Sequence, residues 1–132
     1  MLPYLSGRTN TTAALSLLCT AVFQSSAGDR PSAPNVVVLV ANGESTLDAD
    51  RVSAEAAACR DAGVVLIVVA ADRTLSDSAE LKSIVTWPIE RNYFVVPYLS
   101  AIPERVRSIL PATCNGRQHV TVLLRFLPCV VS

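Results

Sequence analysis

Apolar segments rich in β-branched residues alternate with helical patterns along the chain. The three segments are Asn35 to Ala41, Val64 to Ala71 and Tyr93 to Val96. Each is apolar at nearly consecutive positions, which is typical of strands in a parallel sheet that is covered on both faces. The alternation therefore predicts an α/β fold in which helices connect parallel strands.

The stretch between the first two apolar segments, residues 45 to 63, has the composition of a helix. Ser45 or Asp48 is positioned to cap its amino end, and its alanines favour the helical state. Gly63 suits the left-handed position just beyond its carboxyl end.

Two further helices are predicted around the third apolar segment. Before it, Asp77 and Glu80 have the spacing of a capping box, and Trp87-Pro88 ends the helix. After it, Ser100 is suited to cap a helix that Pro111 ends. This last helix has one apolar stripe, made of Leu99, Ile102, Val106, Ile109 and Leu110.

The two ends of the chain each leave a choice of interpretation. Residues 10 to 23 predict a helix that is apolar almost all round and hence sandwiched between other elements. The alternative is a secretory signal, since Arg8, the stretch AALSLLCTAVF and the small residues before Gly28 have its layout. Residues 115 to 132 break the alternation, and they either add an edge strand to the sheet or form a tail of other structure.

The composition supports a globular chain and excludes some classes of partner. The 132 residues are 51% hydrophobic and 17% charged, with a mean hydropathy of +0.41, so the chain can bury a core. Eleven basic residues balance eleven acidic ones, and aromatic residues are few, which argues against nucleic acid and anionic lipid as partners. No apolar run reaches the roughly 18 residues that a membrane span needs.

The four cysteines, Cys19, Cys59, Cys114 and Cys129, permit three complete pairings, and the sequence alone does not choose among them. A structural zinc site lacks ligands at the right spacing, because there is no C-x-x-C pair and the only histidine is His119. Cys59 lies on an apolar helical face and Cys19 inside an apolar helix. We therefore predict that both are buried small hydrophobes and not partners in a disulfide.

Motifs of catalysis are missing from the sequence. It contains no G-x-S-x-G, no glycine-rich phosphate loop and no histidine near a predicted strand end, so we predict that the chain is not an enzyme. Asp72-Arg73-Thr74-Leu75-Ser76 has the letters of a metal-binding D-x-T-x-S loop, but its place in the chain argues against that role. Asn10-Thr11-Thr12 is a glycosylation sequon, although Asn10 as a helix cap is the interpretation we favour.

The most specific motifs are the turn GRTNT at residues 7 to 11, which opens a helix, and NGES at residues 42 to 45, which follows a strand. Together with four further segments, these motifs resemble a von Willebrand factor A domain of the extracellular-matrix type found in collagens and matrilins. The segments, in chain order, are LPYLSGRTNTTAAL, DAGVVLIVVAAD, ELKSIVTWP and NYFVVPYLSAI. The resemblance covers residues 2 to 114 and implies a Rossmann-like three-layer α/β sandwich. It also favours the helix over the signal, because a signal is not expected to begin with this turn.

The resemblance implies a metal-ion-dependent adhesion site at the carboxyl edge of the sheet, held in the family by a D-x-S-x-S loop, a threonine and an aspartate. Thr9 corresponds to the threonine, and Asn42 stands where the aspartate would be. An amide oxygen is neutral, so the implied site is degenerate, with weak or no binding of Mg²⁺. The alternative is that Thr9 and Asn42 serve only in turns.

In family order, the first strand and the D-x-S-x-S loop would lie ahead of Met1, so residues 1 to 114 are predicted to be a partial domain and residues 115 to 132 a tail. The resemblance implies an adhesive module of a secreted, extracellular-matrix-type protein, with neighbouring domains in a larger chain. Its candidate ligands are collagen and other matrix proteins, and it needs no cofactor beyond weakly bound Mg²⁺. The alternative is a purely structural or assembly unit. By the same resemblance, Cys114 is a candidate for a disulfide to a cysteine ahead of the first strand.

Overall fold

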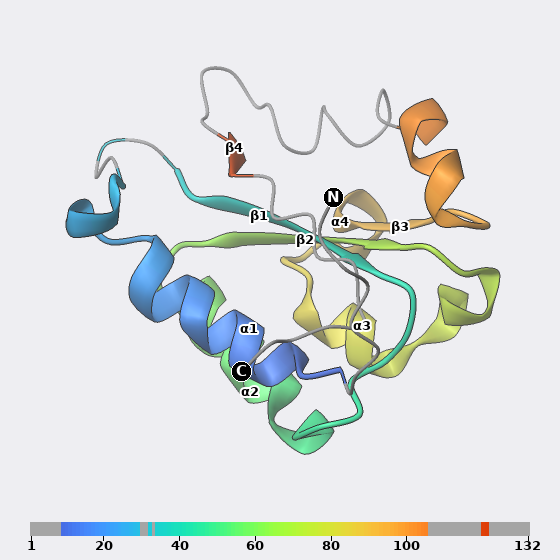
Figure 1. Cartoon of the computed structure of the whole chain (residues 1–132), viewed down its shortest axis with the longest axis horizontal. Coiled ribbons are helices and arrows are strands. Elements are labelled where there is room, and N and C mark those ends of the chain that lie inside the picture. Colours follow the sequence, from blue (N-terminus) through green and yellow to red (C-terminus); the bar gives the residue numbers. More distant parts are fainter. Residues whose placement is uncertain (1–8, 30–31, 33, 106–119, 122–132) are drawn as a thin grey trace, which may run out of the picture.

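The computed structural model describes residues 9–29, 32, 34–105 and 120–121 (Figure 1). Its strands form one sheet in the order β3-β2-β1-β4, and every adjacent pair is parallel. The strands are β1 (Val36–Ala41), β2 (Val65–Ala70), β3 (Tyr93–Val95) and β4 (Val120–Thr121). The first three lie within the three predicted apolar segments, and the α/β fold with a parallel sheet is confirmed.

Helices and short helical turns connect these strands. The α-helices are α1 (Thr11–Leu17), α2 (Val52–Asp61), α3 (Ala79–Ile84) and α4 (Ile89–Asn92). A π-helical segment, η1 (Leu18–Val22), continues α1. The 3₁₀ turns are η2 (Ser25–Ala27), η3 (Ala49–Arg51), η4 (Arg73–Asp77) and η5 (Leu99–Ala101). Residues 102–105 are helical, whereas Val106 and the rest of the predicted last helix lie outside the described residues.

The two faces of the sheet belong to separate apolar clusters, which explains why the strands show no polar alternation. In Figure 1, α1, α2 and α3 lie on one side of the sheet. The strand residues facing these helices are Val37, Leu39, Ala41, Leu66, Val68 and Ala70. The opposite face packs against Val96, Ala101, Leu99 and Ile102, through Val36, Val38, Val40, Ile67 and Val69.

Two predicted helix ends are confirmed. The Asn10 side chain accepts a hydrogen bond from the Ala13 N–H at 2.8 Å and so caps α1. Gly63 has a φ of +87° just beyond α2, a left-handed conformation that glycine adopts without the strain of a Cβ.

Other predicted caps are wrong. Neither Ser45 nor Asp48 caps α2 with its side chain, because the 3₁₀ turn η3 precedes the helix. The Ser45 hydroxyl instead donates to Leu47 O at 2.8 Å. The cap of α3 is Ser78, whose Oγ accepts from the Leu81 N–H at 3.2 Å. Ser100 lies inside η5 and does not cap the helical turn that follows.

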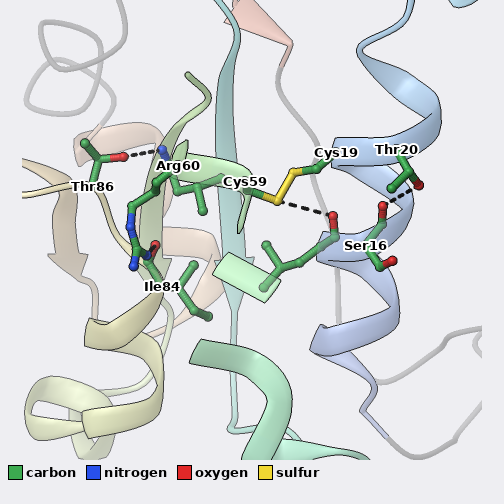
Figure 2. The surroundings of a disulfide bond; sticks show 9 residues. Ser16, Cys19, Thr20, Cys59, Arg60, Ile84 and Thr86 are labelled. Carbon is green, nitrogen blue, oxygen red and sulfur yellow. Dashed lines mark hydrogen bonds between the residues drawn. A yellow bond between two sulfur atoms is a disulfide. The ribbon is translucent and has the colours of Figure 1, made fainter. Parts of the chain in front are cut away.

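The prediction that Cys19 and Cys59 are separate buried hydrophobes is also wrong. They form a disulfide with a Cα–Cα distance of 5.5 Å, which joins η1 to α2 (Figure 2). Cys59 is fully buried as predicted, and Cys19 is half-buried. The pairing arises because α1 packs along α2 and η1 continues α1, which brings together positions 40 residues apart. Cys114 and Cys129 lie outside the described residues.

The end of the chain contributes a short edge strand. β4 pairs with the start of β1, with Val120 opposite Val36 and Thr121 opposite Val37. One of the two interpretations of residues 115 to 132, an edge strand, therefore holds at these two positions. The other residues of that segment lie outside the described part of the chain.

Candidate functional site at the carboxyl edge of the sheet

Because β1, β2 and β3 are parallel, their carboxyl ends meet at one edge of the sheet. Residues 42 to 48 follow β1 at this edge, residues 71 to 78 follow β2, and residues 96 to 101 follow β3. Such an edge is where ligands bind in open α/β sheets. The arrangement makes these three loops the candidate functional site, which we name the carboxyl edge.

Thr9 is buried, with 7% of its surface exposed, and is held by the loop after β1. Its N–H donates to the Thr46 Oγ1 at 2.7 Å. Its carbonyl oxygen accepts from the N–H groups of Thr46 and Leu47, both at 2.9 Å. These contacts use the backbone of Thr9, so they leave its hydroxyl out of the bonds that fix its position.

Asn42 is the first residue after β1, and its surface is exposed. Within the described residues, no hydrogen bond engages its side chain. The bonds between Thr9 and Thr46 bring the segment before α1 to the loop that Asn42 begins. Joint contact of the Thr9 and Asn42 side chains with a cation therefore stays a prediction.

Two carboxylates that were not predicted as site residues connect the β1 loop to α3. The Ser78 hydroxyl donates to Glu44 Oε1 at 2.5 Å, and the Ser45 N–H donates to Glu80 Oε1 at 2.6 Å. Burial raises the pKa of Glu80, the Ser45 N–H opposes that shift, and the nearby charge of Glu44 raises it further. Glu80 thus fastens the β1 loop instead of completing a capping box with Asp77.

Replacing Glu80 with glutamine is expected to raise the melting temperature at pH 7 by about 2 °C. The amide oxygen can still accept from the Ser45 N–H, while the half-buried charge and its repulsion from Glu44 are removed. Because the folded pKa lies above its ordinary value of 4.5, wild type loses stability relative to the variant as pH rises through the folded pKa.

Thermal melts of both proteins between pH 4 and pH 8 measure this difference. Glu104→Gln, an exposed position in the last helical turn, is the matched control and should show no such divergence. If the difference in melting temperature between Glu80→Gln and wild type were the same at every pH, the raised pKa of Glu80 would be contradicted.

The loop after β2 is anchored by Tyr93. The Tyr93 hydroxyl donates to Leu75 O in η4, and Lys82 lies over its ring, with Nζ 5.9 Å from the ring centre. Lys82 also pairs with Asp77 at 3.2 Å. Burial raises the pKa of Tyr93, as do the charges of Glu44 and Asp77. The second loop is therefore fixed by side chains of β3 and α3.

The D-x-T-x-S sequence after β2 forms a local turn. Asp72 Oδ1 accepts from the Thr74 N–H at 2.8 Å and from its hydroxyl at 2.7 Å. These two hydrogen bonds lower the pKa of Asp72, which caps η4. In the structure this motif therefore serves as the turn that starts η4.

The sequon residues take part in the fold. Besides the cap made by Asn10, the Thr12 hydroxyl donates to Asp48 O at 2.7 Å, and Thr12 is 5% exposed. The contact fixes α1 against the start of η3. This is the structural role that the sequence analysis favoured for Asn10.

The donors at the carboxyl edge do not fit a tightly held divalent cation. Asn42 offers a neutral oxygen, and Glu44 and Glu80 each already accept a hydrogen bond. Across the described ranges, no group of three or more His, Cys, Asp or Glu side chains could hold a metal ion. Hard cations such as Mg²⁺ need several oxygen ligands at short distance.

Among the described residues, no helix is both long enough and apolar enough to cross a membrane.

Comparison with protein families gives a match over most of the chain. The sequence model of the von Willebrand factor type A domain matches residues 1–107. Among known proteins, the collagen alpha-1(XII) chain of Oryctolagus cuniculus is 32% identical over 115 residues. That match covers 87% of this chain and 17% of the collagen chain, so the two share less than a fifth of the collagen's length.

Solved structures give a likeness in fold. Two structures of proximal thread matrix protein 1 from the mussel byssus match with a TM-score of 0.73 and 21% sequence identity. They cover 86% of this chain, which spans 29% and 28% of the mussel chain in the two structures. In the second of them, zinc occupies the metal-ion-dependent adhesion site (MIDAS) motif.

Proposed function

The chain belongs to the von Willebrand factor type A domain family, and from this premise we propose that it is a non-enzymatic, protein-binding module that uses the carboxyl edge. The observation that carries the proposal is the set of hydrogen bonds between Thr9 and residues 46 and 47. They bring two segments far apart in sequence together at the sheet edge where α/β folds bind ligands. A rigid edge formed in this way is suited to contact another protein.

The proposed binding depends weakly or not at all on divalent cations. Thr9 and Asn42 would be the metal-proximal residues, but the neutral Asn42 amide cannot supply the charge that a dication requires. The mussel relative, in which zinc occupies the MIDAS motif, supports the location of such a site in the fold. Mg²⁺ bound here would at most assist the contact.

We further propose that the chain acts outside the cell, with matrix proteins such as collagens as ligands. The disulfide between Cys19 and Cys59 supports an oxidising compartment. The relatives are a collagen chain and a byssus matrix protein, of which this chain spans only part. Neighbouring domains and a disulfide from Cys114 to a cysteine elsewhere belong to the same proposal.

Binding to a panel of collagens and other matrix proteins, with EDTA or with Mg²⁺ in the buffer, tests this function. We expect saturable binding to at least one protein, changed less than about two-fold by EDTA, since the edge lacks the carboxylate a dication needs. Asn42→Arg should weaken that binding at least about five-fold, because a bulky cation at the edge obstructs contact.

Ala62→Arg places the same side chain at an exposed position near the opposite end of the sheet, and it should leave binding unchanged. Equal losses in the two variants would place the contact elsewhere. If no matrix protein binds in either buffer, the purely structural or assembly role is the better account.

A further inference from the structure

The disulfide between Cys19 and Cys59 connects two parts of the chain with unequal attachments to the core (Figure 2). Cys59 lies in α2 and has 0% of its surface exposed. Cys19 lies in η1 and is half-buried, so it is the more exposed of the two bridged residues. The two cysteines therefore differ in their access to a reductant.

Residues 18–29 have few other ties to the fold. The Thr20 hydroxyl donates to Ser16 O, the Gln24 side chain donates to Thr20 O, and the Phe23 N–H donates to Leu18 O. All three bonds are local. In the described part of the chain, no hydrogen bond or ion pair joins this segment to α2, α3 or the sheet. Its remaining attachment is apolar contact, with Leu18 buried and Val22 and Phe23 half-buried against the core.

By contrast, α1 is fastened independently of the bridge. Leu15 is 1% exposed in the core, and the Thr12 hydroxyl donates to Asp48 O. The backbone of Thr9, just before the helix, is bonded to the β1 loop. Loss of the disulfide therefore leaves α1 attached while it removes the covalent link from η1 to α2. A π-helical segment, rare in proteins and frequent at functional sites, occupies the less attached part.

The reduced form of Cys59 has a hydrogen-bond acceptor already in place. Its Sγ lies 3.4 Å from Leu15 O in α1. In the disulfide this sulfur carries no hydrogen, so the approach is only a contact. As a thiol, Cys59 can donate to that carbonyl without any movement of α2. The helix pair is thus compatible with both oxidation states of the cysteines.

We propose that the Cys19–Cys59 disulfide is a redox-operated clamp, and that its reduction releases η1 while α1, α2 and the sheet stay folded. A dithiol reductant attacks as a thiolate at Cys19 Sγ, which breaks the bond between the two cysteines and forms a mixed disulfide. Cys59 leaves as a thiolate and takes a proton from solvent. The second thiol of the reductant then displaces Cys19, so the reductant is oxidised to a disulfide and the protein gains two thiols.

Hydrogen exchange read by mass spectrometry, with and without dithiothreitol, tests the clamp. The chain carries Cys114→Ser and Cys129→Ser, so that only the Cys19–Cys59 pair responds, and alkylation of two thiols verifies reduction. We expect the amides of residues 18–23 to exchange about ten-fold faster or more, while those of α2 and β2 change less than about two-fold.

The variant that also carries Cys19→Ser and Cys59→Ser should exchange fast in residues 18–23 with or without reductant. Unchanged exchange of residues 18–23 on reduction would overturn the proposal. Parallel acceleration across α2 and β2 would overturn it too, because the disulfide would then hold the whole domain. The outcome is independent of whether the carboxyl edge binds matrix proteins.

Discussion

Replacing Asn42 with aspartate is expected to raise the affinity of the protein for Mg²⁺ about ten-fold. The substitution adds one full negative charge at the exposed position directly after β1, beside the loop that holds Thr9. A unit charge within about 4 Å of a cation near a protein surface is worth at least about 1 kcal/mol, and about 1.4 kcal/mol corresponds to a factor of ten. Isothermal titration of Mg²⁺ at low ionic strength measures the change.

Asn35→Asp is the matched control, since it makes the same chemical change one residue before β1, at the opposite end of the same strand. Its Mg²⁺ affinity should equal that of wild type. If both variants gain affinity to the same extent, the gain is general electrostatic attraction. If neither gains, Asn42 serves as a strand-ending turn and the degenerate metal site is wrong.

The strands could be predicted from the sequence because their signal is local. Runs such as Val36 to Ala41 are apolar at every position, and only a sheet packed on both faces buries all of those side chains. The Asn10 cap and the Gly63 helix end were equally predictable, since each depends on the conformation of one residue and its near neighbours.

The hydrogen bonds that Glu44 and Glu80 make at the carboxyl edge could not be predicted, because each joins residues distant in sequence. Glu44 accepts from Ser78 and Glu80 from Ser45, over separations of 34 and 35 positions. Glu80 also fits a local pattern, the capping box, and that pattern was misleading because the tertiary bond to Ser45 replaces it. The glutamate within the NGES motif was the available signal, and its meaning depended on α3 lying beside the β1 loop.

The disulfide shows the same limit. Cys19 and Cys59 each lie on an apolar face, so a local pattern cannot distinguish a buried thiol from one half of a bridge. The pairing is decided by how α1, which η1 continues, lies along α2. The prediction that the helix at residues 10 to 23 is sandwiched was also wrong, because Leu17 is 61% exposed.

The contrast between the buried Leu15 and the exposed Leu17 in α1 gives the prediction with the largest expected effect on stability. Leu15→Ala should lower the free energy of unfolding by about 3 kcal/mol, because it removes a fully buried side chain from the cluster between α1, α2 and the sheet. Leu17→Ala, two positions along the same helix, should change it by less than about 0.5 kcal/mol. Urea denaturation of both variants and wild type under oxidising conditions measures the two values.

The two variants share one chemical change in one helix, so burial separates the two values. Alanine forms helix slightly better than leucine, and this small gain in stability is common to both variants. Similar losses in the two variants would mean that Leu17 is covered in the folded protein, as the sequence pattern suggested. A large loss for Leu15 alone would show that α1 lies on the sheet by a single face. The opposite face of α1 would then be available to a neighbouring domain, without any change in the packing that holds Thr9 at the carboxyl edge.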